Sequence, residues 1–228
     1  VATAGAGRTL AEARAPAIRP LPGGRVLLHG AASTDCGVPS DWAAGPRRPG
    51  VELTGLSERA GRELGARVAA IRRPGDIVVV SIHWGTNWGY QTPEPHRRFG
   101  HALIEAGDVA IVHGHSSHHP RPIEVYRGRL ILYGCGDFIN DYEGIRGYEE
   151  FRSELVAMYF ADLERSGALR RLRLAPLRIR RLRLERPEPA DVVWLAATLT
   201  EQSRPFGTTF EPTPDGMIEV GWSSATQG

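Results

Sequence analysis

Two short, mostly apolar segments, separated by a stretch of helix length, constrain the fold of this chain more than any other feature of its sequence. Residues 76–83 (DIVVVSIH) and 108–114 (DVAIVHG) are rich in β-branched residues, as expected of strands that are covered on both faces. Between them, the sequence predicts a helix with Thr92 as its N-cap and Pro93 at its first position, ending at Gly107. This order of elements predicts an α/β fold with a parallel sheet.

Another helix precedes this unit, and a strand-rich region follows it. Apolar residues recur at positions 60, 64, 68 and 71, so a helix is expected between Ser57 and Pro74. Within residues 170–184, Arg alternates with Leu or Ile at a period of two, which is typical of a strand. The other expected elements are a strand at 25–30, a hairpin around 127–128, a strand at 154–163, a helix at 190–202 and a hairpin around 214–216.

The length of 228 residues is sufficient for one large domain with a substantial core. We expect a single domain, 1–228, with a Gly- and Pro-rich lead-in (1–56), an α/β core that holds the histidines (57–145) and a strand-rich part with one helix (146–228). Because the chain does not start with Met, we expect it to lack its N-terminal part.

The sequence carries no targeting signal that fixes a compartment. No apolar run approaches the length of a membrane-spanning helix, about 18 residues, and the first residues lack the pattern of a signal peptide. A cytoplasmic location is therefore favoured for this chain, and a membrane-associated or cell-envelope location of the full-length protein is the alternative.

The charge composition argues against a nucleic-acid partner. The formal net charge is only +2, all cationic side chains are Arg, and the Arg-rich segment 170–184 has no interleaved aromatic residues on which bases could stack. We interpret this segment as a solvated sheet face; pairing of its guanidinium groups with an anionic polymer is the alternative. Cys36 and Cys135 lie outside any CxxC spacing, which favours two buried free thiols.

Histidines gather where the two buried strands are expected to end. His83 ends the first strand, and His113, His115, His118 and His119 follow or end the second. Ligands in parallel α/β sheets bind beyond the carboxyl ends of the strands, and neutral imidazole is the commonest side-chain ligand of Zn, Mn and Fe. We therefore expect His83 and two of the other histidines to converge on one site. The alternative is a polar loop in which the imidazoles are solvated or bond to the backbone.

Polar residues near this cluster are further candidates. Asn87 lies in the segment WGTNWGY (84–90) and could act as a ligand or as an oxyanion donor. Asp137 and Asp141 could supply carboxylates to a metal or act in acid–base chemistry, and turn residues are the alternative. Three other histidines are expected to be structural or on the surface rather than ligands: His29, His96 and His101.

Residues 76–145 resemble the CapA family of capsule and poly-γ-glutamate synthesis proteins. Four motifs occur in the family's order: HWG (83–85), GHSSH (114–118), PIEVYRGRL (122–130) and GDF (136–138). The family is similar in fold to the calcineurin-like metallophosphoesterases, whose two sheets are covered by helices. The resemblance thus implies an α/β (α+β sandwich) fold with mixed sheets, as part of a four-layer arrangement.

The same resemblance implies a site and a function. It places His83, His115 and His118 as ligands of divalent metal ions (Mn, Fe or Zn), which would form a dinuclear centre in the full-length protein. The expected catalytic residues are His83 and His115, together with the candidates Asn87 and Asp137 named above. The expected function is capsule or poly-γ-glutamate synthesis, with metal-dependent hydrolase activity in the full-length protein.

The family's early Asp motif and its Asn-Asn-His motif are not present, so we expect the chain alone to be inactive. The alternatives are a non-catalytic subunit that binds the anionic polymer or its synthase, and a structural fragment without activity. The oligomeric state is left open.

Overall fold

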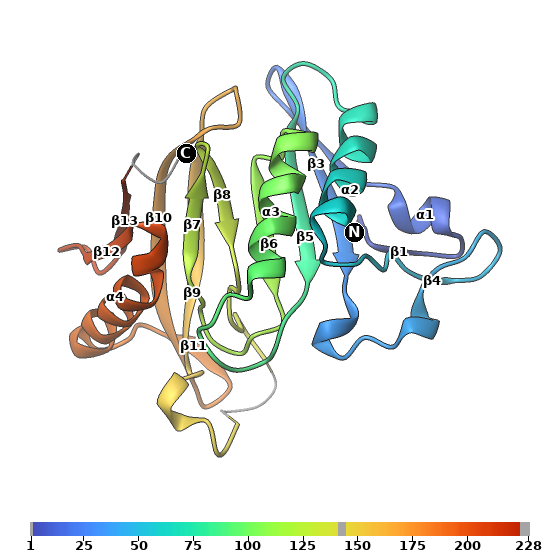
Figure 1. The fold of residues 1–228 in the computed structure, drawn as a ribbon. Coiled ribbons are helices and arrows are strands. Elements are labelled where there is room, and N and C mark those ends of the chain that lie inside the picture. The colour runs from blue at the N-terminus through green and yellow to red at the C-terminus, as the bar shows by residue number, and fades with distance from the viewer. Residues whose placement is uncertain (1, 141–144, 224–228) are drawn as a thin grey trace.

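A six-stranded mixed sheet forms the centre of the structure, a computed structural model that describes residues 2–140 and 145–223. Its strand order is β2-β3-β5-β6-β8-β7 (Figure 1). The inner strands β3, β5, β6 and β8 are parallel, whereas β2 and β7 are antiparallel edges. The bounds are β2 Ala17–Leu21, β3 Gly24–Ala32, β5 Ile77–His83, β6 Ile111–His115, β7 Ile123–Tyr126 and β8 Arg129–Leu132.

Helices α2 (Glu58–Ile71) and α3 (Glu94–Gly107) cover one face of this sheet side by side (Figure 1). Ser57 caps α2 as expected, since its side chain accepts a hydrogen bond from the amide of Ala60. The expected cap of α3 was one residue too early: Pro93, with φ −59° and ψ 142°, is the N-cap, and the helix begins at Glu94. The two helices pack closely at Gly61, where a Cβ would lie 2.6 Å from the carbonyl oxygen of Phe99.

A five-stranded antiparallel sheet and helix α4 (Pro189–Ser203) complete the second half of the molecule. Apolar side chains of β7 and β8 share one core with this sheet and with α4. Leu172 and Leu174 point into that core, which accounts for the alternation of Leu with Arg. The bounds are β9 Leu155–Leu163, β10 Leu169–Arg180, β11 Arg183–Glu185, β12 Thr208–Pro212 and β13 Ile218–Trp222.

The α/β class, with mixed sheets packed against helices as in an α+β sandwich, is confirmed. The N-terminal region holds more structure than the single expected strand, because β2 and β3 form one side of the central sheet. Strand β2 has no apolar periodicity and contains Pro20, as an edge strand tolerates, so no local pattern predicts it. This region also contains β1 Ala6–Gly7, α1 Leu10–Arg14 and β4 Gly50–Val51.

Short 3-10 helices occur at Thr34–Cys36, Ser40–Trp42, Glu149–Phe151 and Arg204–Phe206. Both cysteines are free thiols and half-buried, rather than fully buried as expected. Among the helices of residues 2–140 and 145–223, none has the length and apolar character needed to cross a bilayer.

His29 is a structural residue of β3, as expected, and it is buried with no hydrogen-bond partner for its Nε2 atom. Burial, together with the charge of Arg67, lowers the pKa of His29 to about 4. The folded protein therefore keeps this imidazole neutral at a pH at which the unfolded chain protonates it.

We predict that the His29→Leu variant loses less stability in acid than the unmodified protein. The unfolded state binds the His29 proton near pH 6.5 and the folded state only near pH 4, so stability falls as the pH drops between these values. Urea unfolding at pH 7 and pH 4.5 should show a loss that is smaller in the variant by about 2 kcal/mol. An equal loss in both proteins would show that His29 is protonated in the fold.

Candidate functional site

The carboxyl ends of three parallel strands meet at one edge of the central sheet. The register pairs Ala32 of β3 with His83 of β5, and His83 with His115 of β6. Because parallel strands in register present paired residues on the same face, the two imidazoles lie side by side. Their Nδ1 atoms are 3.0 Å apart and their ring centroids 5.0 Å apart.

Both imidazoles of this pair are held in the neutral form. Burial lowers the pKa of His83, although the nearby charge of Asp35 opposes the shift. Burial, followed by the like charges of His113 and His83, lowers the pKa of His115 to about 4. In a neutral pair at this distance, one Nδ1–H donates to the lone pair of the other Nδ1. This hydrogen bond occupies the Nδ1 lone pair of one ring, and a metal ion that replaced it would receive a lone pair from each neutral imidazole.

Asp35 is a site residue that the sequence analysis missed. It follows the end of β3, and its carboxylate accepts hydrogen bonds from the Gly85 amide (3.1 Å), from His96 Nε2 (2.7 Å) and from the Ser33 hydroxyl. Burial raises the pKa of Asp35, but these hydrogen bonds outweigh it and lower the pKa to about 2. The rule that singled out His83 would have found Asp35 if the strand expected at 25–30 had been extended to Ala32.

His96 is not on the surface, which corrects the expectation. Only 3% of the residue is exposed, and its ring stacks on Trp84 with centroids 4.9 Å apart. The first turn of α3 points toward the ends of β3 and β5, so His96 bonds to Asp35 there. His101, one turn further along α3, is half-buried against Tyr126 and bonds to Glu124 (2.9 Å).

A second group contains the other predicted site residues of the described ranges, His118, Asp137 and Asn87. His118 Nδ1 lies 3.1 Å from a carboxylate oxygen of Asp137, and its ring lies 5.2 Å from that of Trp88. The exposed Asn87 accepts hydrogen bonds at its backbone oxygen from the His118 amide (3.1 Å) and at Oδ1 from the Ser116 hydroxyl (3.3 Å). The remaining candidate carboxylate, Asp141, lies outside the described residues.

The donor set fits a metal ion only in part. His83 and His115 present two neutral imidazoles to one point, and Zn or Mn accepts such ligands. Among residues 2–140 and 145–223, however, no three His, Cys, Asp or Glu side chains are grouped so that they could hold a metal. The described residues therefore supply a two-histidine pair and no bridging carboxylate of a dinuclear centre.

Trp84 links the histidine pair to the core. It is 1% exposed, its Nε1 donates to the Tyr133 carbonyl (3.1 Å), and its ring packs against Phe99. Gly114, between His113 and His115, leaves the room that this indole occupies: a Cβ there would overlap Trp84 Nε1 and lie 2.6 Å from the Leu132 carbonyl oxygen.

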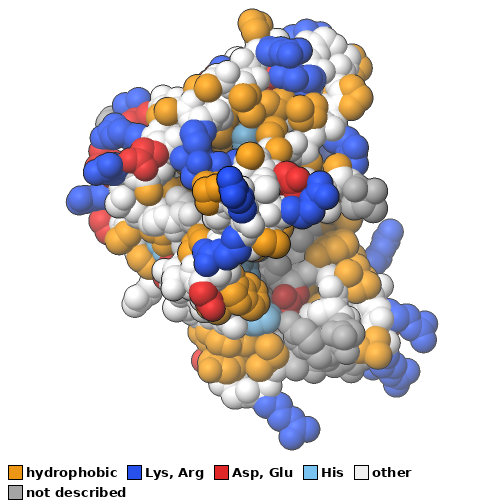
Figure 2. Space-filling view, turned by 90° about the vertical axis from the view of Figure 1, so that its right-hand side faces the viewer, with side chains coloured by type: hydrophobic (Ala, Val, Ile, Leu, Met, Phe, Trp, Pro, Cys, Tyr) orange, Lys and Arg blue, Asp and Glu red, His pale blue; other side chains and the backbone are white. Residues whose placement is uncertain are grey.

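Two cavities adjoin the strand ends. One, of about 790 Å³, is lined by Asp35, His96, Arg97 and Arg121 together with aromatic side chains. The other, of about 580 Å³, lies between the two sheets, where His113 and His115 border mostly apolar side chains. Figure 2 shows a recess in the surface where histidine, acidic and hydrophobic side chains meet.

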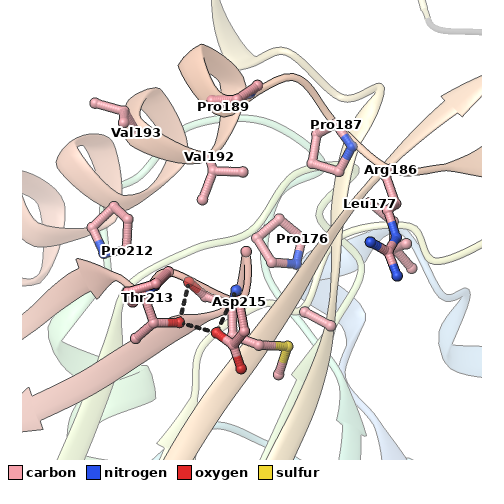
Figure 3. Close-up of a pocket in the computed structure, with 14 residues that line it drawn as sticks. Pro176, Leu177, Arg186, Pro187, Pro189, Val192, Val193, Pro212, Thr213 and Asp215 are labelled. Atoms are coloured by element: carbon pink, nitrogen blue, oxygen red, sulfur yellow. Dashed lines mark hydrogen bonds between the residues drawn. The ribbon is translucent and has the colours of Figure 1, made fainter.

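A third cavity, of about 420 Å³, lies away from the histidines, between α4, β10 and the turn that joins β12 to β13 (Figure 3). Prolines and valines dominate its lining, and Asp215 there bonds to the Thr213 hydroxyl. Its lining is mostly apolar, with Arg186 and Asp215 as the charged residues, whereas the histidines of the candidate site lie at the strand ends.

Comparison with known proteins places this arrangement in a family. The bacterial capsule synthesis protein PGA_cap family matches residues 1–142. The chain belongs to this family. A probable polyglutamine synthesis accessory protein of Mycobacterium tuberculosis is 49% identical over 201 residues, which cover 86% of this chain and 52% of the relative.

The PGA biosynthesis protein CapA of Bacillus subtilis is 33% identical over 100 residues, which cover 44% of this chain and 24% of the relative. The capsule biosynthesis protein CapA of Bacillus anthracis is 29% identical over 84 residues, 37% of this chain and 19% of the relative. The expected resemblance to the CapA family is thus confirmed. The chain spans about half the length of the mycobacterial relative and less of the others.

We predict that the Gly114→Ala variant displaces Trp84 and lowers the stability of the protein. The added Cβ meets the indole and a backbone oxygen, neither of which can move without disturbing the core, so a loss of about 1–3 kcal/mol is expected. Thermal unfolding and the fluorescence of the buried indole would both report it. Unchanged values would mean that the sheet edge relaxes freely around position 114.

Proposed function

We propose that this chain takes part in polyglutamate capsule synthesis and that the end of its central sheet is a metal-dependent hydrolytic centre of the complete protein. The observation that carries the proposal is the close approach of His83 Nδ1 and His115 Nδ1, 3.0 Å, at the ends of neighbouring parallel strands. The names of the mycobacterial and Bacillus relatives, which refer to polyglutamine or PGA synthesis and to capsule biosynthesis, support the process.

The residues of this chain have distinct roles in such a centre. His83 and His115 hold the ion through their neutral imidazoles; when bound, the ion would polarise an ester or amide oxygen and lower the pKa of a water molecule. Asp35 fixes the Gly85 amide and His96 through its hydrogen bonds, which keeps the segment after β5 in place. The hydrogen bond between His118 and Asp137 fixes the orientation of these two side chains.

The first test is metal binding by the chain as it stands. Titration calorimetry with Mn²⁺ and Zn²⁺ at pH 7 should show one site, and His83→Ala or His115→Ala should weaken it by at least about tenfold. His101→Ala is the matched control, because His101 lies on α3 against Tyr126 and away from the pair. Equal binding by all four proteins would refute the proposed centre.

A second candidate function is a non-catalytic subunit that binds the anionic polymer or its synthase. The observation in its favour is that Arg170, Arg173 and Arg180 extend from β10 with no ion pair within residues 2–140 and 145–223. Part of the arginine segment is already neutralised, since Arg171 pairs with Glu219 and Arg178 with Asp191. The remaining positive charge favours a loose contact with a long polyanion.

We predict that long polyglutamate binds in a manner that is sensitive to salt and indifferent to chelators. Replacing Arg170, Arg173 and Arg180 by Gln should weaken this binding about two- to fivefold, because an exposed ion pair contributes at most about 1 kcal/mol. Electrophoretic or calorimetric titration with and without EDTA measures both properties. If EDTA abolishes binding while the triple variant retains it, the metal centre and not β10 is the binding surface.

A further inference from the structure

A buried guanidinium with no carboxylate partner lines the cavity of about 790 Å³ beside the strand ends. Arg121 is 4% exposed. Its Nε donates to the Gly89 carbonyl (2.8 Å), and its Nη2 donates to the Gln91 carbonyl (3.1 Å) and to the Thr86 hydroxyl (3.4 Å). All three acceptors are neutral, and within the described ranges Arg121 has no ion pair.

Burial of this guanidinium is unfavourable unless a ligand supplies a negative charge next to it. Arg is rarely buried without a counter-charge, since an uncompensated charge of this kind costs several kcal/mol. The carboxylate in the lining, Asp35, is already bonded to His96, Ser33 and the Gly85 amide. The charge of Asp35 acts on Arg121 at longer range, but no carboxylate of the described residues forms an ion pair with this guanidinium, so an anion that enters the cavity can do so.

A second guanidinium faces the same cavity. Arg97, on α3, has a buried Nε atom that finds no hydrogen-bond partner among residues 2–140 and 145–223. Its contacts with neighbours are weak: Nη1 lies 3.4 Å from a carboxylate oxygen of Glu94, and the guanidinium carbon lies 5.3 Å from the Phe206 ring centroid. Two arginines thus line one cavity that is open to solvent, and its volume lies in the range of small-ligand sites.

A glycine keeps this space open between His96 and Arg121. Gly85 has φ +76°, and a Cβ at this position would lie 3.0 Å from His96 Cε1 and 3.1 Å from Arg121 Nη1. Any other residue would be strained there and would crowd the guanidinium. The cavity also has an apolar wall, formed by Tyr90 and Phe151 with centroids 5.4 Å apart and by Trp88.

We propose that this cavity binds a carboxylate of a glutamyl chain, held by Arg121 and Arg97, with its methylene groups against the wall of Trp88, Tyr90 and Phe151. A planar carboxylate matches the fork of a guanidinium and accepts two parallel hydrogen bonds. The short aliphatic stem of a glutamyl unit suits an aromatic wall, which inorganic phosphate would leave unused. The glutamyl identity of the ligand rests on the proposed function, whereas the recognition of a carboxylate rests on the two arginines alone.

The experiment uses a γ-linked glutamate trimer, which is too short to bridge many charges on β10. In calorimetry at low ionic strength, the trimer should bind the unmodified protein, and Arg97→Gln and Arg121→Gln should each weaken it by about tenfold or more. The same trimer with all its free carboxylates converted to primary amides should not bind. Arg98→Gln is the matched control, because Arg98 is the next residue on α3, is exposed and pairs with Glu94.

Three outcomes would overturn the proposal. These are unchanged affinity in both cavity variants, equal binding of the amidated trimer, and binding of inorganic phosphate with none of the glutamate trimer. Arg121 also holds the backbone of residues 89–91, so Arg121→Gln could fail to fold; Arg97→Gln then decides the result alone.

The outcome is distinguishable from that of the metal proposal. Failure of trimer binding with metal binding through His83 intact rejects only the carboxylate site. Arginine-dependent trimer binding without metal binding rejects only the metal centre.

Discussion

The in-register parallel pairing of β3, β5 and β6 is the constraint on which the rest of the site depends. It brings Ala32, His83 and His115 to one edge of the sheet at the same height, whatever the loops beyond them do. Backbone hydrogen bonds continue this alignment past the strands, from the Ser33 amide to the His83 carbonyl and from the Trp84 amide to the His115 carbonyl. The loops that follow these three strands therefore all start from one aligned edge of the sheet, and the candidate functional site lies among these loops.

Burial then determines the chemistry of the groups gathered there. It keeps His83 and His115 neutral, whereas Asp35 stays ionised because donors surround its carboxylate. Neutral imidazoles near an ionised carboxylate are a common feature of sites that handle metals or protons. The same edge borders the cavity with Arg97 and Arg121, because Asp35 and Gly85, which follow β3 and β5, also line it. In a protein of the PGA_cap family, this proximity would bring a bound glutamyl chain close to the histidines.

The sequence predicted the elements with strong periodicity or continuous burial. Helix α2, strand β5 and the β7–β8 hairpin lie where they were expected, because their apolar patterns and turn residues are local signals. Strand β6 begins at Ile111 rather than 108, since Asp108 adopts the left-handed conformation that ends α3. The edge strand β2 was missed because its side chains are mostly exposed and show no apolar periodicity. His96 was placed on the surface because helical geometry alone does not show which loop will cover the first turn.

The sequence by itself determined the class of fold, the family and the strand ends at which the histidines lie, since these follow from local hydrophobic patterns and short motifs. Only the tertiary structure decided which of those residues meet. It paired His83 with His115 and His118 with Asp137, and it added Asp35 and Arg121, which come from segments far apart in the chain. The physical reason is that strand register and loop packing depend on contacts between distant segments, and no local pattern encodes the distance between two side chains.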